Sequence, residues 1–313
     1  MALVNTRTLI YAKVESTYGT DPTPTNTADA IVAYEVEGPV PEIDMLERRD
    51  FGPTLGREKE LPGRCRASIK FITELRGSGT AGTAPKGMSG LFQACACSET
   101  VSGGVSVTYA PSSASLKSVT IWIFKDGLKH IINGAVGNFE IVLESGETPK
   151  IKWDFVGLYA TPTDVALPTN ATPDTTVPKV CKGLTVTFDS YSAVFRKFSF
   201  KSNNTIAERG DLNASTGIAG FQIVERNPEG SFESETVLVA TKNWYTKWEA
   251  GTAQAMSLSI SNGAGNIVTI TAAQCQTRKK EYADSDGILT DTIEFQMAKS
   301  STTTSDEYSI ALT

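Results

Sequence analysis

The sequence predicts a mainly β protein made of two related β-sandwich units, each with one short flanking helix. Three observations predict this fold: apolar and polar residues alternate along most of the chain, only two short segments have helical spacing, and landmarks of the first half recur in order in the second. The chain has 313 residues, of which 40% are hydrophobic and 20% charged, so it has the composition of a globular protein and the length for two domains.

The predicted strands have one apolar and one polar side. Ile151, Trp153 and Phe155 point one way, whereas Lys152 and Asp154 point the other. The same alternation occurs at residues 139–143, 184–188, 198–200, 256–260 and 293–297. One side of each strand therefore packs inward, and the other faces water or a neighbouring molecule.

Two short segments have the spacing of an amphipathic helix. After the breakers at Pro85 and Gly87, apolar residues of the segment 88–95 fall three and four positions apart. In the segment 241–251, Trp244 and Trp248 are four residues apart, and Gly251 is placed to end the helix. Helices of two or three turns are not stable alone, so both are expected to pack on a sheet.

An internal duplication is indicated by four pairs of landmarks. The segment 46–51 resembles 207–212, the two helices follow, the turn dipeptides Asp126-Gly127 and Asn262-Gly263 come next, and Phe155 matches Phe295. We therefore expect a first unit with an N-terminal arm at residues 1–160, a linker at 161–180 with four prolines, and a second unit at 181–313. Chance similarity between β proteins is the alternative explanation.

Composition disfavours several functional classes. The net charge of −6 gives no basic field to hold a phosphate backbone. Five irregularly spaced cysteines favour reduced thiols over a disulfide framework. We also expect neither a signal peptide nor a membrane span, because no apolar stretch approaches about 18 residues.

A search for catalytic chemistry nominates no residue. His130 is the single histidine, and the sequence supplies neither a nucleophile nor an orienting partner for it, so it is predicted to lie on a strand surface. Cys95 and Cys97 have no second ligand pair at zinc-site spacing and are expected to act as small apolar residues. No catalytic, cofactor-binding or metal-binding residue is predicted.

Two loops have partial matches to ligand-binding motifs. Residues 77–87 are rich in glycine, but Pro85 and Gly87 break the order of a phosphate-binding loop. Residues 284–287 begin like a calcium loop and lack the later ligands, so a plain β-turn is expected.

One loop has the mixed charge that suits a protein interface. Residues 44–66 interleave basic and acidic side chains, whereas a nucleic-acid patch would be more one-sided. The predicted contact residues of this loop are Glu47, Arg48, Arg49, Asp50, Arg57, Glu58, Lys59 and Glu60. A merely solvated loop is the alternative.

The chain resembles the tail tube (major tail) proteins of siphophages and related prophages over nearly its whole length. The resemblance rests on the opening LIYAKVESTYGTDPTPTNTADAI, the run ERRDFGPTLG, the run RGSGTAGTAPKGMSGLFQACACSET, the segment KWDFVGLYATPTDVALP and the turn YADSDGI. It implies a structural virion protein, not an enzyme, that is assembled in the host bacterial cytoplasm and resides in the virion tail.

The resemblance also implies how such a protein works. Inner sheets of neighbouring subunits join into a continuous β-barrel ring, and stacked rings enclose a lumen for double-stranded DNA and the tape measure protein. Tail terminator and baseplate or distal tail proteins are the other implied partners. If the usual ring has six units and this chain carries two, the ring is a trimer with pseudo-sixfold symmetry; a hexamer with a decorative second domain is the rival.

An acidic or neutral lumen would let DNA slide without sticking, since several weak phosphate contacts add up to a strong hold. The lumen-facing carboxylates are predicted to be Glu140, Glu144, Asp154 and Glu294. Inter-ring contacts are expected from the 44–66 loop and the N-terminal segment. The alternative function is a virion decoration or adhesin-like β-sandwich that binds a host surface glycan.

Overall fold

The computed structural model describes residues 3–49 and 51–313, which form nineteen strands and two helices. The prediction of a mainly β fold is confirmed. The first half contains the helix α1 (Met88–Ala94) and the strands β1 (Thr8–Val14), β2 (Ala30–Ile31), β3 (Tyr34–Leu46), β4 (Leu61–Glu74), β5 (Cys97–Ser102), β6 (Ser106–Pro111), β7 (Val119–Lys125), β8 (Leu128–Glu144), β9 (Lys150–Tyr159) and β10 (Thr163–Asp164).

The second half contains the helix α2 and nine strands. Its elements are α2 (Tyr245–Glu249), β11 (Thr185–Phe188), β12 (Phe195–Lys201), β13 (Asn204–Gly210), β14 (Ile218–Arg226), β15 (Glu229–Glu235), β16 (Gln254–Ser261), β17 (Ile267–Ser285), β18 (Ile288–Met297) and β19 (Ser309–Leu312).

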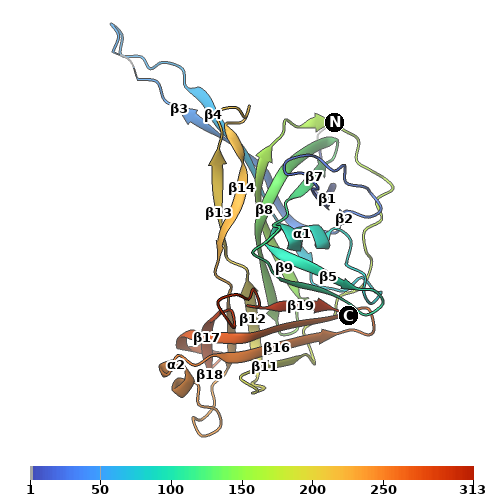
Figure 1. Ribbon diagram of the computed structural model, residues 1–313, viewed down its shortest axis with the longest axis vertical. Coiled ribbons are helices and arrows are strands. Elements are labelled where there is room, and N and C mark those ends of the chain that lie inside the picture. The colour runs from blue at the N-terminus through green and yellow to red at the C-terminus, as the bar shows by residue number, and fades with distance from the viewer. Residues whose placement is uncertain (1–2, 50) are drawn as a thin grey trace.

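A central antiparallel sheet runs through both halves in the order β3-β4-β9-β8-β12-β15-β18-β17. The two halves of this sheet are connected through β8, which has 17 residues. The start of β8 pairs with β7, whereas its last five residues, Glu140–Glu144, pair with β12. The long strand therefore carries backbone hydrogen bonding from the first half into the second (Figure 1).

Shorter strands form the outer layers. In the first half, β1 pairs with β2 and β7; in the second half, β11 pairs with β16, which pairs with β17. The C-terminal strand β19 pairs with both β17 and β6, so it ties the second half to the first. The strands β13 and β14 form a separate hairpin that runs beside β8 toward the projecting ends of β3 and β4 (Figure 1).

The hydrophobic core lies between the central sheet and the outer layers. In the first half it is built around Phe92 of α1, whose ring lies 4.6 Å from that of Tyr109 and 5.0 Å from that of Trp153. Phe139 of β8 then contacts Phe200 of β12, with ring centroids 5.4 Å apart. Because these residues belong to one buried cluster that includes the core of the second half, the two halves are packed together.

Most local predictions are confirmed, and two need correction. The second helix is shorter than expected, because Trp244 lies at its N-cap and it ends at Glu249. Residues 262–266 form a five-residue loop between β16 and β17, whereas Asp126-Gly127 does form the predicted two-residue turn with positive φ at both residues. Cys95 at the end of α1 and Cys97 at the start of β5 are both buried, as expected of small apolar residues.

Loops and linker are docked on the strands. The backbone N–H of Gly77 donates to Asn266 at 2.7 Å, which holds the glycine-rich loop against the 262–266 loop. Arg76 donates to the carbonyls of Asp174 and Thr176 in the segment proposed as a linker. Within residues 3–49 and 51–313, neither helix is long and apolar enough to cross a membrane.

We expect the two halves to unfold in one transition because Phe139 joins their cores. Phe139→Ala should lower the free energy of unfolding by about 3–5 kcal/mol, measured by urea denaturation with circular dichroism. The control is Phe51→Ala, which removes a fully exposed ring and should change stability by less than about 0.5 kcal/mol. Two separate transitions in the wild-type protein would contradict the shared core.

Candidate assembly surfaces

The central sheet has one face turned away from the core, and the four predicted lumen-facing carboxylates all lie on it. The pairing register places Glu140 and Glu144 of β8 on the same side as Asp154 of β9 and Glu294 of β18, because successive side chains alternate between faces. The structure therefore brings these four side chains onto one surface, although they come from both halves of the chain.

Each carboxylate from the first half has a lysine partner on a neighbouring strand. Lys152 lies 3.2 Å from Glu140, and Lys70 lies 3.2 Å from Asp154. Lys197 of β12 lies 3.0 Å from Glu144 and joins the two halves across the β8–β12 boundary. These pairs are half-exposed, so each contributes little to stability, but together they make the surface mixed in charge and not acidic.

Sequence reasoning placed Lys152 on the polar side of its strand together with Asp154, but it did not identify any lysine as the partner of a carboxylate. The signal was present, because Lys197 and Lys201 alternate with Phe198 and Phe200 in β12 as Lys152 alternates with Ile151 and Trp153 in β9. The period shows on which side of a strand a lysine lies, and the cross-strand register decides which carboxylate it pairs with.

The predicted contact loop forms the tip of an arm made by β3 and β4. Residues 61–65 of β4 pair only with β3, whereas residues 66–74 also pair with β9. The arm formed by these ends of β3 and β4 projects from the body of the molecule (Figure 1). The described members of the predicted set are exposed at this tip; Asp50 lies outside the described residues. Glu47 pairs with Arg49 at 2.8 Å, and longer contacts of 3.9 Å join Arg57 to Glu47 and Arg48 to Glu58.

The base of the arm is held by the β13–β14 hairpin. Glu208 of β13 accepts from Arg64 at 2.8 Å, and Arg66 contacts Glu42 at 2.7 Å and Glu208 at 3.4 Å. The backbone N–H of Cys65 also donates to the carbonyl of Thr216 at 3.0 Å. The arm is therefore fixed at its base while its tip is exposed.

The two outermost strands of the central sheet, β3 and β17, each have an edge without a strand partner within residues 3–49 and 51–313. One is the outer edge of β3, whose other edge pairs with β4. The second lies on the C-terminal half of β17. The pairing of β17 with β16 ends at Cys275, so after this residue β17 is paired only on its other edge, with β18. Unpaired edges offer backbone N–H and C=O groups to another chain, so both are candidate docking surfaces.

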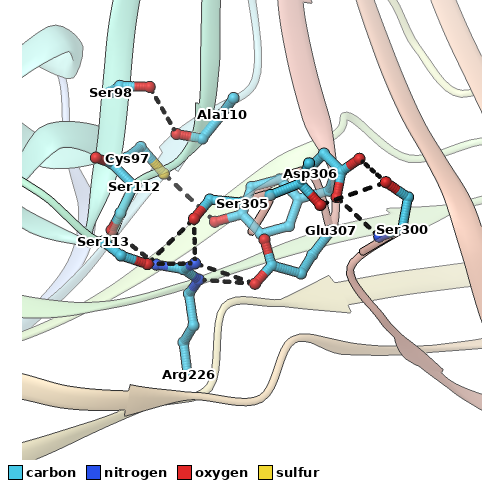
Figure 2. Close-up of polar contacts among 12 residues, drawn as sticks. Cys97, Ser98, Ala110, Ser112, Ser113, Arg226, Ser300, Ser305, Asp306 and Glu307 are labelled. Carbon is cyan, nitrogen blue, oxygen red and sulfur yellow. Dashed lines mark hydrogen bonds and ion pairs between the residues drawn. The ribbon is translucent and has the colours of Figure 1, made fainter. Parts of the chain in front are cut away.

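A buried polar cluster fixes the C-terminal segment that joins the halves. Figure 2 shows Arg226 of β14 between two loops: its guanidinium donates to the carbonyl of Ser112 at 2.7 Å and to Glu307 at 3.0 Å. The side chains of Arg226 and Glu307 are only 13% and 10% exposed. Next to them, the Cys97 thiol lies 3.3 Å from the Tyr308 hydroxyl. These contacts hold the segment before β19 beside the segment after β6, where the two strands pair.

Burial changes the pKa of His130 and of the Cys97 thiol. Burial, and to a lesser extent Lys125, lower the pKa of His130, which lies half-buried on β8. Burial raises the pKa of Cys97 to about 12. Among the described residues, no group of three or more His, Cys, Asp and Glu side chains is placed to hold a metal ion.

The family model described as phage tail tube protein matches residues 5–297, which is nearly the whole chain. No curated protein matches the chain.

We expect Cys65 to be the first of the five free thiols to react with a disulfide reagent at pH 8, because it is half-buried and the other four are buried. At that pH, a thiol of pKa about 12, such as Cys97, is thiolate in about one molecule in ten thousand. Absorbance stopped-flow should show one fast thiol, which Cys65→Ser removes and Cys275→Ser leaves. Several fast thiols would argue against the buried positions of the other cysteines.

Proposed function

The chain belongs to the phage tail tube protein family, and from this premise we propose that three copies close into a ring and that rings stack into the tail tube. The observation that carries the trimer is the central sheet of eight strands, which runs through both halves and ends in two open edges. Joining the β17 edge of one copy to the β3 edge of the next closes three such sheets into one barrel and removes the open edges.

We propose that the chain carries two copies of one unit. Equivalent elements in matching order support this: β3, β4, α1, β7, β8 and β9 in the first half, and β12, β15, α2, β16, β17 and β18 in the second. The pairings agree as well, since β7–β8–β9 and β16–β17–β18 are corresponding antiparallel sets. The β8–β12 boundary is then a unit-to-unit junction inside one chain, and it serves as the template for the junction between chains.

The polar face of the central sheet is the proposed lumen wall. Three of its carboxylates, Asp154, Glu140 and Glu144, are paired with lysines, so a phosphate backbone meets basic groups that are already compensated. We propose that double-stranded DNA and the tape measure protein pass along this face. Tail terminator and baseplate or distal tail proteins would cap the two ends of the tube, which is assembled in the host cytoplasm.

The arm is the proposed contact between stacked rings. Its tip is exposed and charged, and its base is fixed by Arg64, Arg66 and Glu208. A glycan-binding decoration protein, the other function considered, would need exposed aromatic platforms, and none of the four tryptophans is exposed: Trp153 and Trp244 are buried, and Trp122 and Trp248 are half-buried.

Electron microscopy of the purified protein tests the ring directly. We expect stacked rings or tubes whose averaged cross-section has threefold symmetry with six similar lobes, and a ring mass of three 33.5 kDa chains by mass photometry. A sixfold ring of six chains would refute the trimer, and dispersed monomers under all assembly conditions would refute the tube.

Charge reversal at the arm tip tests the stacking contact. Arg48→Glu with Arg49→Glu should leave rings intact and prevent tube growth, because opposite charges across the ring-to-ring contact become like charges. Negative-stain images and sedimentation separate rings from tubes. The charge-matched control is Lys182→Glu with Lys299→Glu, at exposed positions away from the arm. Unchanged tube growth in the arm variant would exclude the tip as the stacking contact.

A further inference from the structure

The arm carries large apolar side chains that the rest of the chain does not cover. At its tip, Phe51 and Leu55 are fully exposed. Four more, on the paired strands of the arm, are about half exposed: Ile43, Met45, Leu46 and Leu61. A hairpin of two strands is only marginally stable by itself, and apolar side chains gathered on an exposed surface mark a contact with another molecule.

The corresponding hairpin of the second half, β13–β14, is covered by the chain itself. β13 and β14 continue the β12–β15 pair after short interruptions, as the arm continues the paired bodies of β3 and β4. Ile218, Phe221 and Ile223 of β14 are buried in one cluster with Val136 of β8. Of the two corresponding hairpins, one therefore packs on its own chain, whereas the other projects without such cover (Figure 1).

The arm lies at one end of the strands of the central sheet. The pairing register places the start of β4 on the same side as the end of β9, the start of β8, the end of β12, the start of β15 and the end of β18. In the closed barrel proposed above, these strand ends form one rim and the opposite ends form the other. The end of β15 and the β17–β18 turn lie at the rim opposite to the arm (Figure 1).

An apolar patch lies at this opposite rim. It is formed by residues 238–239 after β15 and residues 282–289 around the β17–β18 turn. The backbone N–H of Thr236 donates to the carbonyl of Leu289 at 3.0 Å, which holds the two segments side by side. We call the patch the rim patch, and its side chains are between 51% and 79% exposed: Leu238, Val239, Tyr282, Ile288 and Leu289.

Tyr282 is held in place within the rim patch. The ammonium of Lys280 lies 4.0 Å from the centre of the Tyr282 ring and pairs with Asp291 at 2.6 Å. Both side chains of this ion pair are buried, and the Tyr282 hydroxyl contacts that of Tyr245. A side chain that is already fixed loses little freedom when a partner binds, so the patch is suited to receive apolar groups.

The corresponding turn of the first half differs in chemistry from the rim patch. Residues 145–149, between β8 and β9, read Ser-Gly-Glu-Thr-Pro and include no large aliphatic or aromatic residue. Each chain therefore offers one projecting arm and one rim patch, although it carries two proposed units. A ring of three chains presents three of each, on opposite rims.

The charges around the two surfaces are complementary. The rim patch is bordered by the carboxylates of Glu235, Asp284 and Asp286, and the segments 227–240 and 281–297 contain no basic residue. At the arm tip, Arg48 and Arg57 each contact a carboxylate at 3.9 Å, so their guanidinium groups have N–H donors left for a second partner. Arginines of the tip can thus pair with the carboxylates beside the patch.

We propose that the arm of one copy binds the rim patch of a copy in the next ring, with Phe51 and Leu55 against the apolar side chains and the tip arginines against the carboxylates. This inference rests on the ring and the stacking contact proposed above, and it names the surface that receives the arm. The two surfaces differ, so the contact is heterologous. Because they lie on opposite rims, the contact repeats from ring to ring without closing, and the tube grows.

The difference between the two halves also limits how rings stack. If both units carried a projecting arm and a rim patch, one ring could sit on the next in six equivalent rotations. With one arm and one patch in each chain, only three rotations are equivalent, and every arm meets a turn of the second half. The duplicated chain thereby gives the stack the threefold symmetry of its ring.

Site-specific cross-linking tests the contact directly. The full chain carries the photoreactive amino acid p-benzoylphenylalanine at position 51, and assembled tubes are irradiated, digested and analysed by mass spectrometry. We expect cross-links to residues 235–241 or 282–289 of another chain, which unassembled chains should not give. Cross-links that form only to other segments would overturn the assignment.

Substitution within the rim patch tests its energetic role. Leu238→Asp should leave rings intact and raise the concentration at which half of the rings are in tubes by roughly tenfold or more, because a carboxylate enters the apolar contact in all three chains. The matched control is Val177→Asp, since Val177 is 71% exposed and Leu238 is 79% exposed. The control should leave this concentration unchanged. Light scattering and negative-stain images measure tube growth.

A charge exchange tests the ionic part of the contact. Glu235→Lys with Asp284→Lys should block tube growth, as reversal of Arg48 and Arg49 does, because like charges then meet between rings. Combining these two substitutions with Arg48→Glu and Arg49→Glu should restore growth near the wild-type concentration. Circular dichroism melts confirm that each variant is folded.

The outcomes separate this inference from the proposals on which it rests. Normal tube growth after Leu238→Asp and after Glu235→Lys with Asp284→Lys would exclude the rim patch, while a block by the arginine reversals would still support the arm as the stacking contact. A fourfold variant that stays impaired would overturn the charge pairing. Wild-type chains that form no tubes would overturn both the rim patch and the stacking proposal.

Discussion

The structure depends on the need of strand β8 for hydrogen-bond partners along both edges. A strand of 17 residues is longer than either half can cover alone: β7 and β9 serve its beginning and middle, and β12 serves its end. Unpaired backbone groups at a sheet edge are costly when buried and adhesive when exposed. By meeting this demand with a strand from the second half, the chain forms one sheet and moves its open edges out to β3 and β17.

The packing of the core follows from that continuous sheet. Because β8 and β12 are neighbours, the inward-pointing rings of Phe139 and Phe200 meet, and Tyr308 closes over Phe200 at 4.8 Å. The C-terminal segment can then be held by Arg226 and can add β19 to both β17 and β6. Backbone pairing, core packing and the buried ion pair thus join the same two halves, which makes the polar face a rigid surface instead of two hinged ones.

The fold was predictable wherever a local period decided it. Alternation identified β8, β9, β12, β16 and β18, and three- and four-residue spacing identified α1. The 262–266 loop was misjudged because Asn-Gly favours a two-residue turn only when the strands continue to it, and here Asn266 is used to hold Gly77. The β8–β12 pairing was beyond sequence reasoning, since contacts between residues far apart in the chain depend on tertiary packing.

The candidate surfaces were predictable to the same extent. The carboxylates Glu140 and Asp154 followed from the polar side of alternating strands, and the arm tip followed from its mixed charge. The lysine partners depend on cross-strand register, and the open edges depend on knowing which strands are already paired. Neither property can be read from one strand at a time.

The proposed duplication, with two units in one chain, changes what the edges must do. In a ring of identical single units every junction is the same, so every first strand must suit every last strand. In a two-unit chain the internal junction is held by covalent connection and by the shared core, and its charges are free to differ from those between chains. Three bodies also lose less translational and rotational freedom on closure than six do.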